Sequence, residues 1–176
     1  DYHRVEETIV VGGAASTTTF IRIFRAFVYT AGTDRSNKNI LNINGNNTAN
    51  LLAQIGVDGT GGNAVGRGQT YMAMYTVPAG KTGFIMQWTA GSGKQNTDAT
   101  SSMYIRPFGD DRAFFVQDLI LTSATTFTKT YVTPILVPEK SDIEIRSYSS
   151  VNNTPISSSF HLFQIDNDEF PGSGTP

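Results

Sequence analysis

The sequence of 176 residues predicts an all-β fold, an antiparallel β-sandwich of jelly-roll type. Short runs rich in Val, Ile, Phe, Tyr and Thr dominate it, and their branched and aromatic side chains fit a pleated sheet. Turn residues separate these runs at about the 8–12-residue spacing of sandwiches and barrels. No stretch of about 11 residues combines the helical period with helix caps. A barrel is the alternative architecture.

Strand patterns occur in eleven segments along the chain. In order they are Val5–Val11, Phe20–Thr30, Asn39–Ile43, Leu51–Val57, Thr70–Val77, Thr82–Ala90, Ser101–Pro107, Ala113–Thr122, Thr126–Val137, Asp142–Ser149 and Ser158–Ile165. Polar and apolar residues alternate cleanly in one of them, where Ile143 and Ile145 face one way and Asp142, Glu144 and Arg146 the other.

Other strand segments are apolar on both faces. Phe84, Met86 and Trp88 are expected on one face and Ile85 on the other, and Thr70–Val77 shows the same character. A strand of this kind lies either inside a thick core or against another chain. The sequence leaves both explanations open.

Turn chemistry divides these strands. Val77–Lys81 contains the Pro and Gly of a tight hairpin, and Val137–Asp142 is a polar corner entered through a proline. Phe108–Arg112 is a turn between two apolar runs. The Asn- and Gly-rich segments Asn44–Asn50 and Gly56–Gly68 are expected to be loops.

The chain divides into three expected parts. Residues 1–11 are expected to form a strand that belongs with a further N-terminal region, because a chain that begins inside a strand resembles a fragment of a longer protein. Residues 12–165 form the β-sandwich domain. Residues 166–176 are a flexible tail, since they have little apolar surface to bury.

Composition narrows the possible partners. The formal net charge is −2, from 13 basic and 15 acidic residues, so nucleic acid is not expected as a partner. No segment approaches the about 18 apolar residues of a membrane span. Only 16% of residues are charged, below the roughly 25% of ordinary soluble domains. Such a surface is suited to close packing against neighbouring subunits.

Motifs for catalysis and cofactor binding are missing from the sequence. His3 lies at the start of the chain, and His161 is expected to be a histidine on a sheet surface, without a nucleophile motif. Ala90–Asn96 superficially resembles a phosphate loop, but Gln follows its lysine and no helix pattern comes next, so we expect a hairpin loop. We therefore expect no catalytic residue, no cofactor and no enzymatic activity.

Acidic residues cluster around one turn, which raises the question of a bound cation. Asp110 and Asp111 follow Gly109, and Asp118 is near in sequence. The spacing lacks the central glycine and distal glutamate of an EF-hand loop. We expect solvated turn residues and no metal site.

Arginines inside apolar runs suggest ion pairs between strands or subunits, because a buried guanidinium is costly unless it is paired. Arg22 and Arg25 fall on opposite faces of one such run. Aromatic residues on doubly apolar strands are the other candidates for subunit contact. The candidate interface residues are Arg22, Arg25, Tyr71, Tyr75, Arg106 and Phe115.

An ordered set of motifs resembles virion structural proteins of tailed bacteriophages, often from marine and cyanobacterial hosts. The segments that carry the resemblance are Glu6–Val11, Phe20–Phe27, Gln69–Phe84, Tyr104–Gly109, Ile135–Arg146 and Ser157–Phe160. The resemblance implies a component of the virus particle and supplies no catalytic residue. Similar proteins are longer at the N-terminus, with another β region ahead of residue 1.

Three functions follow as hypotheses. The first is a capsid decoration, cement or head-fibre subunit of the virion that contacts the major capsid protein and forms a homo-oligomer, with a trimer expected from particle geometry. The second is a neck, tail or baseplate protein that touches host glycan. The third is a glycan-active enzyme on a sandwich scaffold, with acids drawn from Asp110, Asp111, Asp118 and Glu144.

Overall fold

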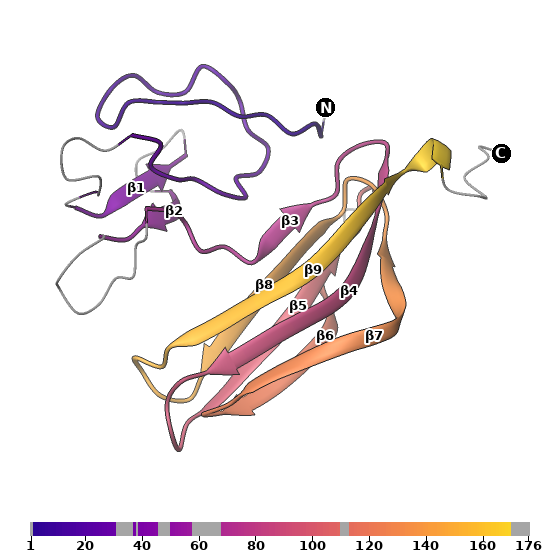
Figure 1. Ribbon diagram of the computed structural model, residues 1–176. Coiled ribbons are helices and arrows are strands. Elements are labelled where there is room, and N and C mark those ends of the chain that lie inside the picture. Colours follow the sequence, from indigo (N-terminus) through magenta and orange to yellow (C-terminus); the bar gives the residue numbers. More distant parts are fainter. Residues whose placement is uncertain are drawn as a thin grey trace. The chain divides into compact units, whose positions relative to one another are not determined.

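The computed structural model describes residues 2–30, 37, 39–45, 50–57, 68–109 and 113–169 (Figure 1). The chain separates into two compact units. The larger unit comprises Asp1–Arg4 and Ala73–Pro176, and the smaller one comprises Val5–Met72. Across these described ranges, no helix has the length and apolar character needed to cross a membrane.

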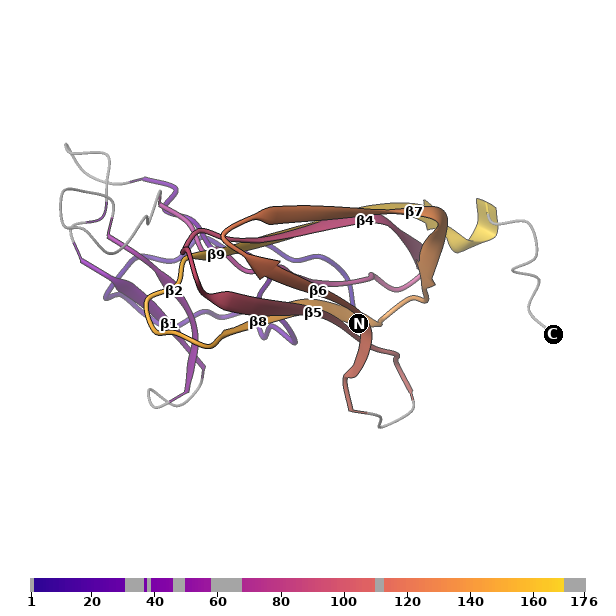
Figure 2. The same cartoon turned by 90° about the horizontal axis from the view of Figure 1, so that it is seen from below.

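The larger unit contains two antiparallel sheets. Sheet A has the strand order β3 (Met74–Thr76), β8 (Asp142–Ser149), β5 (Asp98–Arg106) and β6 (Phe115–Ser123). Sheet B has the order β7 (Thr126–Val137), β4 (Lys81–Ser92) and β9 (Ile156–Asp166). A short 3-10 turn at Asn167–Glu169 follows β9. Figure 2 shows the two sheets as separate layers of this unit.

The hydrophobic core of this unit forms between the two sheets. Its buried members come from both of them and are Val77, Ile85, Trp88, Ala90, Met103, Ile105, Ile120, Val137 and Ile143. Burying one large apolar side chain contributes roughly 1.5–3 kcal/mol. Trp88 is fully buried, with 0% relative exposure. The all-β, antiparallel prediction is therefore confirmed, with the apolar residues of both sheets facing one another.

A β-bulge in β4 corrects the predicted orientation of one core residue. Met86 has no partner in the ladder with β7 or in that with β9. An extra residue on one strand reverses the side that later residues face. Ile85 and Trp88 consequently both lie in the core, whereas simple alternation placed Trp88 on the same face as Phe84. The bulge is invisible in the sequence because Met86 itself suits either face.

Nine of the eleven predicted strands form within the described residues. The bounds of β7 and β8 are those predicted. The strands predicted for Val5–Val11 and Phe20–Thr30 were wrong: these segments have no strand beyond an isolated bridge between Phe27 and Gln69. Strand propensity is chiefly a preference for a half-buried, pleated surface. Most residues of Val5–Val11 are exposed, so the segment lacks that surface.

The smaller unit contains a two-stranded antiparallel sheet, β1 (Leu41–Asn44) with β2 (Leu51–Ile55). The buried side chain of Asn37 donates to the carbonyl oxygens of Asn39 and Gly56 and so joins the two strands at the end where β1 begins and β2 finishes. The predicted loops Asn44–Asn50 and Gly56–Gly68 fall largely outside the described residues. Of the predicted tail 166–176, Asp166 ends β9 and Asn167–Glu169 form the 3-10 turn, and the remainder lies outside the described residues.

Two predicted hairpins are instead crossings between the sheets. Val77–Lys81 leads from β3 of sheet A to β4 of sheet B, with Gly80 at φ 75°. The loop within Ala90–Asn96 leads from β4 back to β5 of sheet A. Pro and Gly determine how tightly the chain turns, and the same turn can join strands of one sheet or of two. The predicted positions of both turns are therefore correct, but the prediction that each turn joins neighbouring strands of one sheet was wrong.

Candidate interaction surface

A row of three polar side chains crosses the outer face of sheet A, on the side away from the core. The ladders align Thr76, Asp142 and Arg106 on three adjacent strands. The carboxylate of Asp142 accepts hydrogen bonds from the Thr76 hydroxyl at 2.5 Å and from Arg106 Nε at 3.0 Å, and Arg106 Nη2 forms an ion pair with it. Asp142 is only 7% exposed. Its two partners therefore compensate an acid that is otherwise costly to bury.

Aromatic rings cover the guanidinium groups beside this row. Arg106 and Arg146 lie 4.8 and 4.9 Å from the centre of the Phe114 ring, and Arg146 is also 4.8 Å from that of Tyr104. The negative face of an aromatic ring attracts a cation at this distance. One phenylalanine thus contacts two arginines that the ladders bring in from different strands. We call Tyr104, Arg106, Phe114 and Arg146 the arginine–aromatic cluster.

The charges around this cluster balance. Arg106 pairs with Asp142, and Arg146 forms an ion pair with Glu144. Two cations and two anions leave this part of the face without a net charge. The Arg146 side chain is 56% exposed, so its guanidinium remains available to a partner. Arginine and aromatic side chains are the residue types that most often carry binding energy at protein interfaces.

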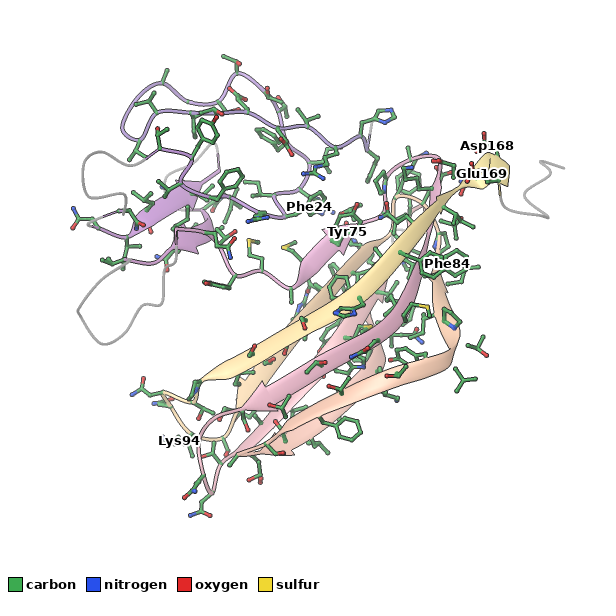
Figure 3. The ribbon with its side chains drawn as sticks, in the orientation of Figure 1. Phe24, Tyr75, Phe84, Lys94, Asp168 and Glu169 are labelled. Atoms are coloured by element: carbon green, nitrogen blue, oxygen red, sulfur yellow. The ribbon has the colours of Figure 1, made fainter. Side chains whose placement is uncertain are left out.

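An apolar row crosses the outer face of sheet B. Leu136, Phe84 and Phe163 are partners on three adjacent strands. The rings of Phe84 and Phe163 stack with their centres 4.9 Å apart, and Figure 3 shows where Phe84 lies on β4. Leu136 and Phe163 are 49% and 45% exposed, and Val132 on β7 is fully exposed. Clustered apolar residues on a surface are typical of contact with another molecule.

A polar cluster connects the two sheets inside the sandwich. The Asp118 carboxylate on β6 accepts hydrogen bonds from Trp88 Nε1 at 3.3 Å, from Lys129 Nζ at 2.9 Å and from the Tyr131 hydroxyl. The backbone N–H of Leu119 also donates to it, at 2.8 Å. Trp88 and the two β7 residues belong to sheet B, so this single carboxylate on sheet A joins β6 to both β4 and β7.

These contacts set the ionisation of the cluster. Burial pulls the pKa of Asp118 upward, but hydrogen bonds from Lys129 and Tyr131, and then from Leu119 and Trp88, hold this pKa below its ordinary value. Burial and the hydrogen bond to Asp118 raise the pKa of the Tyr131 hydroxyl. Asp118 is consequently an anion and Tyr131 a neutral donor at neutral pH. This arrangement stabilises the sandwich and leaves the acid little freedom to exchange protons.

The candidate interface residues are distributed over both units. In the smaller unit, Arg25 donates to the Gln69 side chain at 2.7 Å and lies over the Phe27 ring, while Arg22 donates to the backbone oxygen of Ile21. Tyr71 is 61% exposed. The ion pairs between strands or subunits that were expected for these arginines stay a prediction. Their role as interface residues stays a prediction.

In the larger unit, the structure brings one of the predicted residues into a cluster. Arg106 belongs to the arginine–aromatic cluster, whereas Phe115 begins β6 and is 44% exposed. Tyr75 is half-buried. It lies on β3 (Figure 3). The alternation of β8 placed Arg146 on the polar face of its strand, but sequence reasoning did not include it among the candidate interface residues. Phe114 was missed as well, because it precedes its strand and no local pattern connects it with two arginines.

The acids considered for catalysis do not share a site within the described residues. Asp118 points into the sandwich, while Glu144 pairs with Tyr104 and Met74 on the outer face of the same sheet. Asp110 and Asp111 lie outside the described residues. His161 is exposed on β9, at the position expected of a histidine on a sheet surface. No group of three or more metal-binding side chains occurs in the part of the chain that the structure covers.

Comparisons with family models, with curated proteins and with solved structures give no match.

Proposed function

We propose that this chain is a structural component of a bacteriophage particle, a decoration, cement or head-fibre subunit that acts through protein–protein packing. The observation that carries the proposal is the apolar row Leu136–Phe84–Phe163 on the outer face of sheet B. A sheet that needs only one buried face is usually polar on the other. Apolar residues on that second face are accounted for if a neighbouring subunit covers it.

The strand connections support a jelly roll as the scaffold. Successive strands cross between sheets A and B at every step from β3 to β9 except β5 to β6, which stay together. Sheet A in the order β3-β8-β5-β6 opposes sheet B in the order β7-β4-β9. In an eight-stranded jelly roll, another strand would lie beside β9. Jelly rolls are a common scaffold of viral capsid proteins, which agrees with the proposed location in the particle.

The arginine–aromatic cluster would be the polar part of the contact with the major capsid protein. Arg146 is held over two rings and paired with Glu144, so its orientation is largely fixed before binding. A pre-oriented side chain loses less conformational entropy when a partner binds. The low overall charge, 16% of residues, reduces repulsion between many copies on one shell.

Quantitative mass spectrometry of purified particles tests this function. A copy number that follows the symmetry of the capsid is the expected result. Absence of the chain from purified particles would rule the proposal out. Copies in multiples of three or six per particle would instead assign the chain to the neck, tail or baseplate.

A further inference from the structure

The edges of the two sheets are not equally protected against pairing with another chain. An edge strand exposes unpaired N–H and C=O groups, which natural proteins guard with short strands, bulges, prolines or charges. Among the described strands, β3 has only three residues, and β6 contains Asp118 and an extra residue, Gln117, opposite β5. On β7, residues 131–134 have no partner in the ladder with β4; Pro134 lies within this break and Lys129 just before it. Three of the four edges of sheets A and B are therefore protected against pairing with another chain.

The remaining edge belongs to β9 and has none of these guards. This strand spans Ile156–Asp166, 11 residues, and every residue except Asp166 is uncharged. It contains no proline. It also pairs with β4 without skipping a residue of its own, since the bulge at Met86 lies on β4. β9 thus offers a long, regular and neutral edge.

The hydrogen bonds at the two ends of β9 identify the backbone groups on its free side. Asn167 N donates to Gly80 O, and Gly93 N donates to Pro155 O. In both contacts, a backbone N–H or C=O group of an odd-numbered residue points toward β4. Because successive residues of a strand direct their N–H and C=O groups to opposite sides, the even-numbered residues direct theirs to the free side. These residues are Ile156, Ser158, Phe160, Leu162, Gln164 and Asp166.

We propose that β9 pairs with β9 of a second copy of this chain, antiparallel and about a two-fold axis at Phe160. A two-fold contact needs a self-complementary surface. Centring the axis at Phe160 pairs the even-numbered residues from Ile156 to Gln164 with those of the other copy and leaves only Asp166, at the end of the strand, beyond the ladder. Ser159 then faces His161 of the other copy across a pair without backbone hydrogen bonds. Sheets B of the two copies merge into one continuous sheet.

The chain's own strand-like N-terminal segment is a weaker candidate for this edge. Within Val5–Val11, Glu7 already accepts hydrogen bonds from Ser16, Thr17 and Thr18, and these bonds lower its pKa to about 2. The segment also carries two adjacent carboxylates, whereas β9 matches itself without placing any like charges together.

Molar mass in solution, measured by light scattering on the full chain, is the first test. The expected value is twice the 19.1 kDa of one chain. The double variant Ser159→Lys/His161→Lys brings lysines face to face across the two-fold axis, and we expect it to be monomeric. The control Thr130→Lys/Val132→Lys adds the same charge at exposed positions of β7, the other edge of sheet B, and should stay dimeric.

Single cysteines test the register, because the chain contains no cysteine of its own. Residues facing each other in a pair without backbone hydrogen bonds have Cα atoms about 4.5 Å apart, close enough for a disulfide. Mixing the Ser159→Cys and His161→Cys proteins under oxidising conditions should give a cross-linked heterodimer. Each protein alone should stay uncross-linked, and cross-linking of either one alone would contradict an axis at Phe160.

A monomeric or trimeric wild-type chain would overturn the pairing, as would a dimer that the lysines on β9 leave intact. A trimer would instead agree with the oligomeric state that was expected from the resemblance to virion proteins and the geometry of the particle. This inference concerns one sheet edge and does not depend on the place of the chain in a virus particle. Failure of the pairing would leave the mass-spectrometric test of the particle unaffected.

Discussion

Trp88 and Asp118 lie on opposing sheets, and the indole Nε1 of Trp88 donates a hydrogen bond to the Asp118 carboxylate at 3.3 Å. Trp88 is the only tryptophan of the chain, and its side chain is fully buried. Asp118 is half-buried, with its side chain 12% exposed. The pair fixes the spacing of the two sheets at a point where apolar contacts alone would allow them to slide. It also makes Trp88 fluorescence a direct measure of unfolding of the sandwich.

Asp118→Ala should lower the free energy of unfolding by about 2–4 kcal/mol. The substitution leaves the indole N–H of Trp88 and the hydroxyl of Tyr131 without their acceptor, which is costly inside the sandwich, whereas the lost ion pair with Lys129, whose side chain is 43% exposed, adds little. Urea unfolding followed by Trp88 fluorescence measures the change. Asp98→Ala, at an exposed acid that begins β5, is the control and should change stability by less than about 0.5 kcal/mol. Equal effects of the two substitutions would contradict the role of Asp118.

The same cluster predicts how stability depends on pH. The pKa of Asp118 is lowered in the folded protein, so its contribution is complete above its ordinary value of 3.8 and is lost as the pH falls below it. The pKa of Tyr131 is raised, so its contribution is complete below its ordinary value of 10.0 and is lost at higher pH. The urea midpoint of unfolding, measured as a function of pH, follows these losses of stability. Asp118→Asn should reduce the loss of stability in acid, and Tyr131→Phe should reduce the loss of stability in alkali. Unchanged slopes on both sides would show that other groups dominate.

Gly83 lets three strands approach one another in the core, and Gly83→Ala should destabilise the sandwich by about 1–3 kcal/mol through overpacking. A Cβ atom at this position would lie 3.0 Å from Val77 Cγ2 and 3.1 Å from Leu162 Cδ1. Combining Gly83→Ala with Val77→Ala should cost less than the sum of the single substitutions, because the shorter side chain removes one of the close contacts. Full additivity in a double-mutant cycle of urea unfolding would be evidence against the contact.

The fold was largely predictable because strand formation depends on local composition. The bounds of β7 and β8 followed from runs of β-branched and aromatic residues between turns. Val5–Val11 has the same composition but no paired neighbour, and here the prediction failed. The bulge at Met86 and the sheet crossings at Val77–Lys81 depend on which strands meet in space, which no local pattern encodes.

The candidate interaction surface was less predictable. Arg106 was recognised as an unusual cation in an apolar run, which is a local signal. Its partners Asp142 and Phe114 are separated from it in sequence, and only the ladder between β5 and β8 places Asp142 beside it. The sequence could indicate that Arg106 needs a partner but could not identify which one.

Arg106→Ala should therefore cost more stability than Thr76→Val, although both remove one donor from the same carboxylate. Without Arg106, Asp142 loses its ion pair and the Nε hydrogen bond of a guanidinium whose side chain is 33% exposed, so we expect a loss of about 2–4 kcal/mol. Without the Thr76 hydroxyl, Asp142 keeps its ion pair, so we expect a loss of about 1–2 kcal/mol. Chemical unfolding of both variants, monitored by Trp88 fluorescence, gives the order. The double variant Arg106→Ala/Asp142→Ala should be more stable than Arg106→Ala alone, because the second substitution also removes the carboxylate that has lost its ion pair. A double variant that is less stable than Arg106→Ala would contradict the pairing.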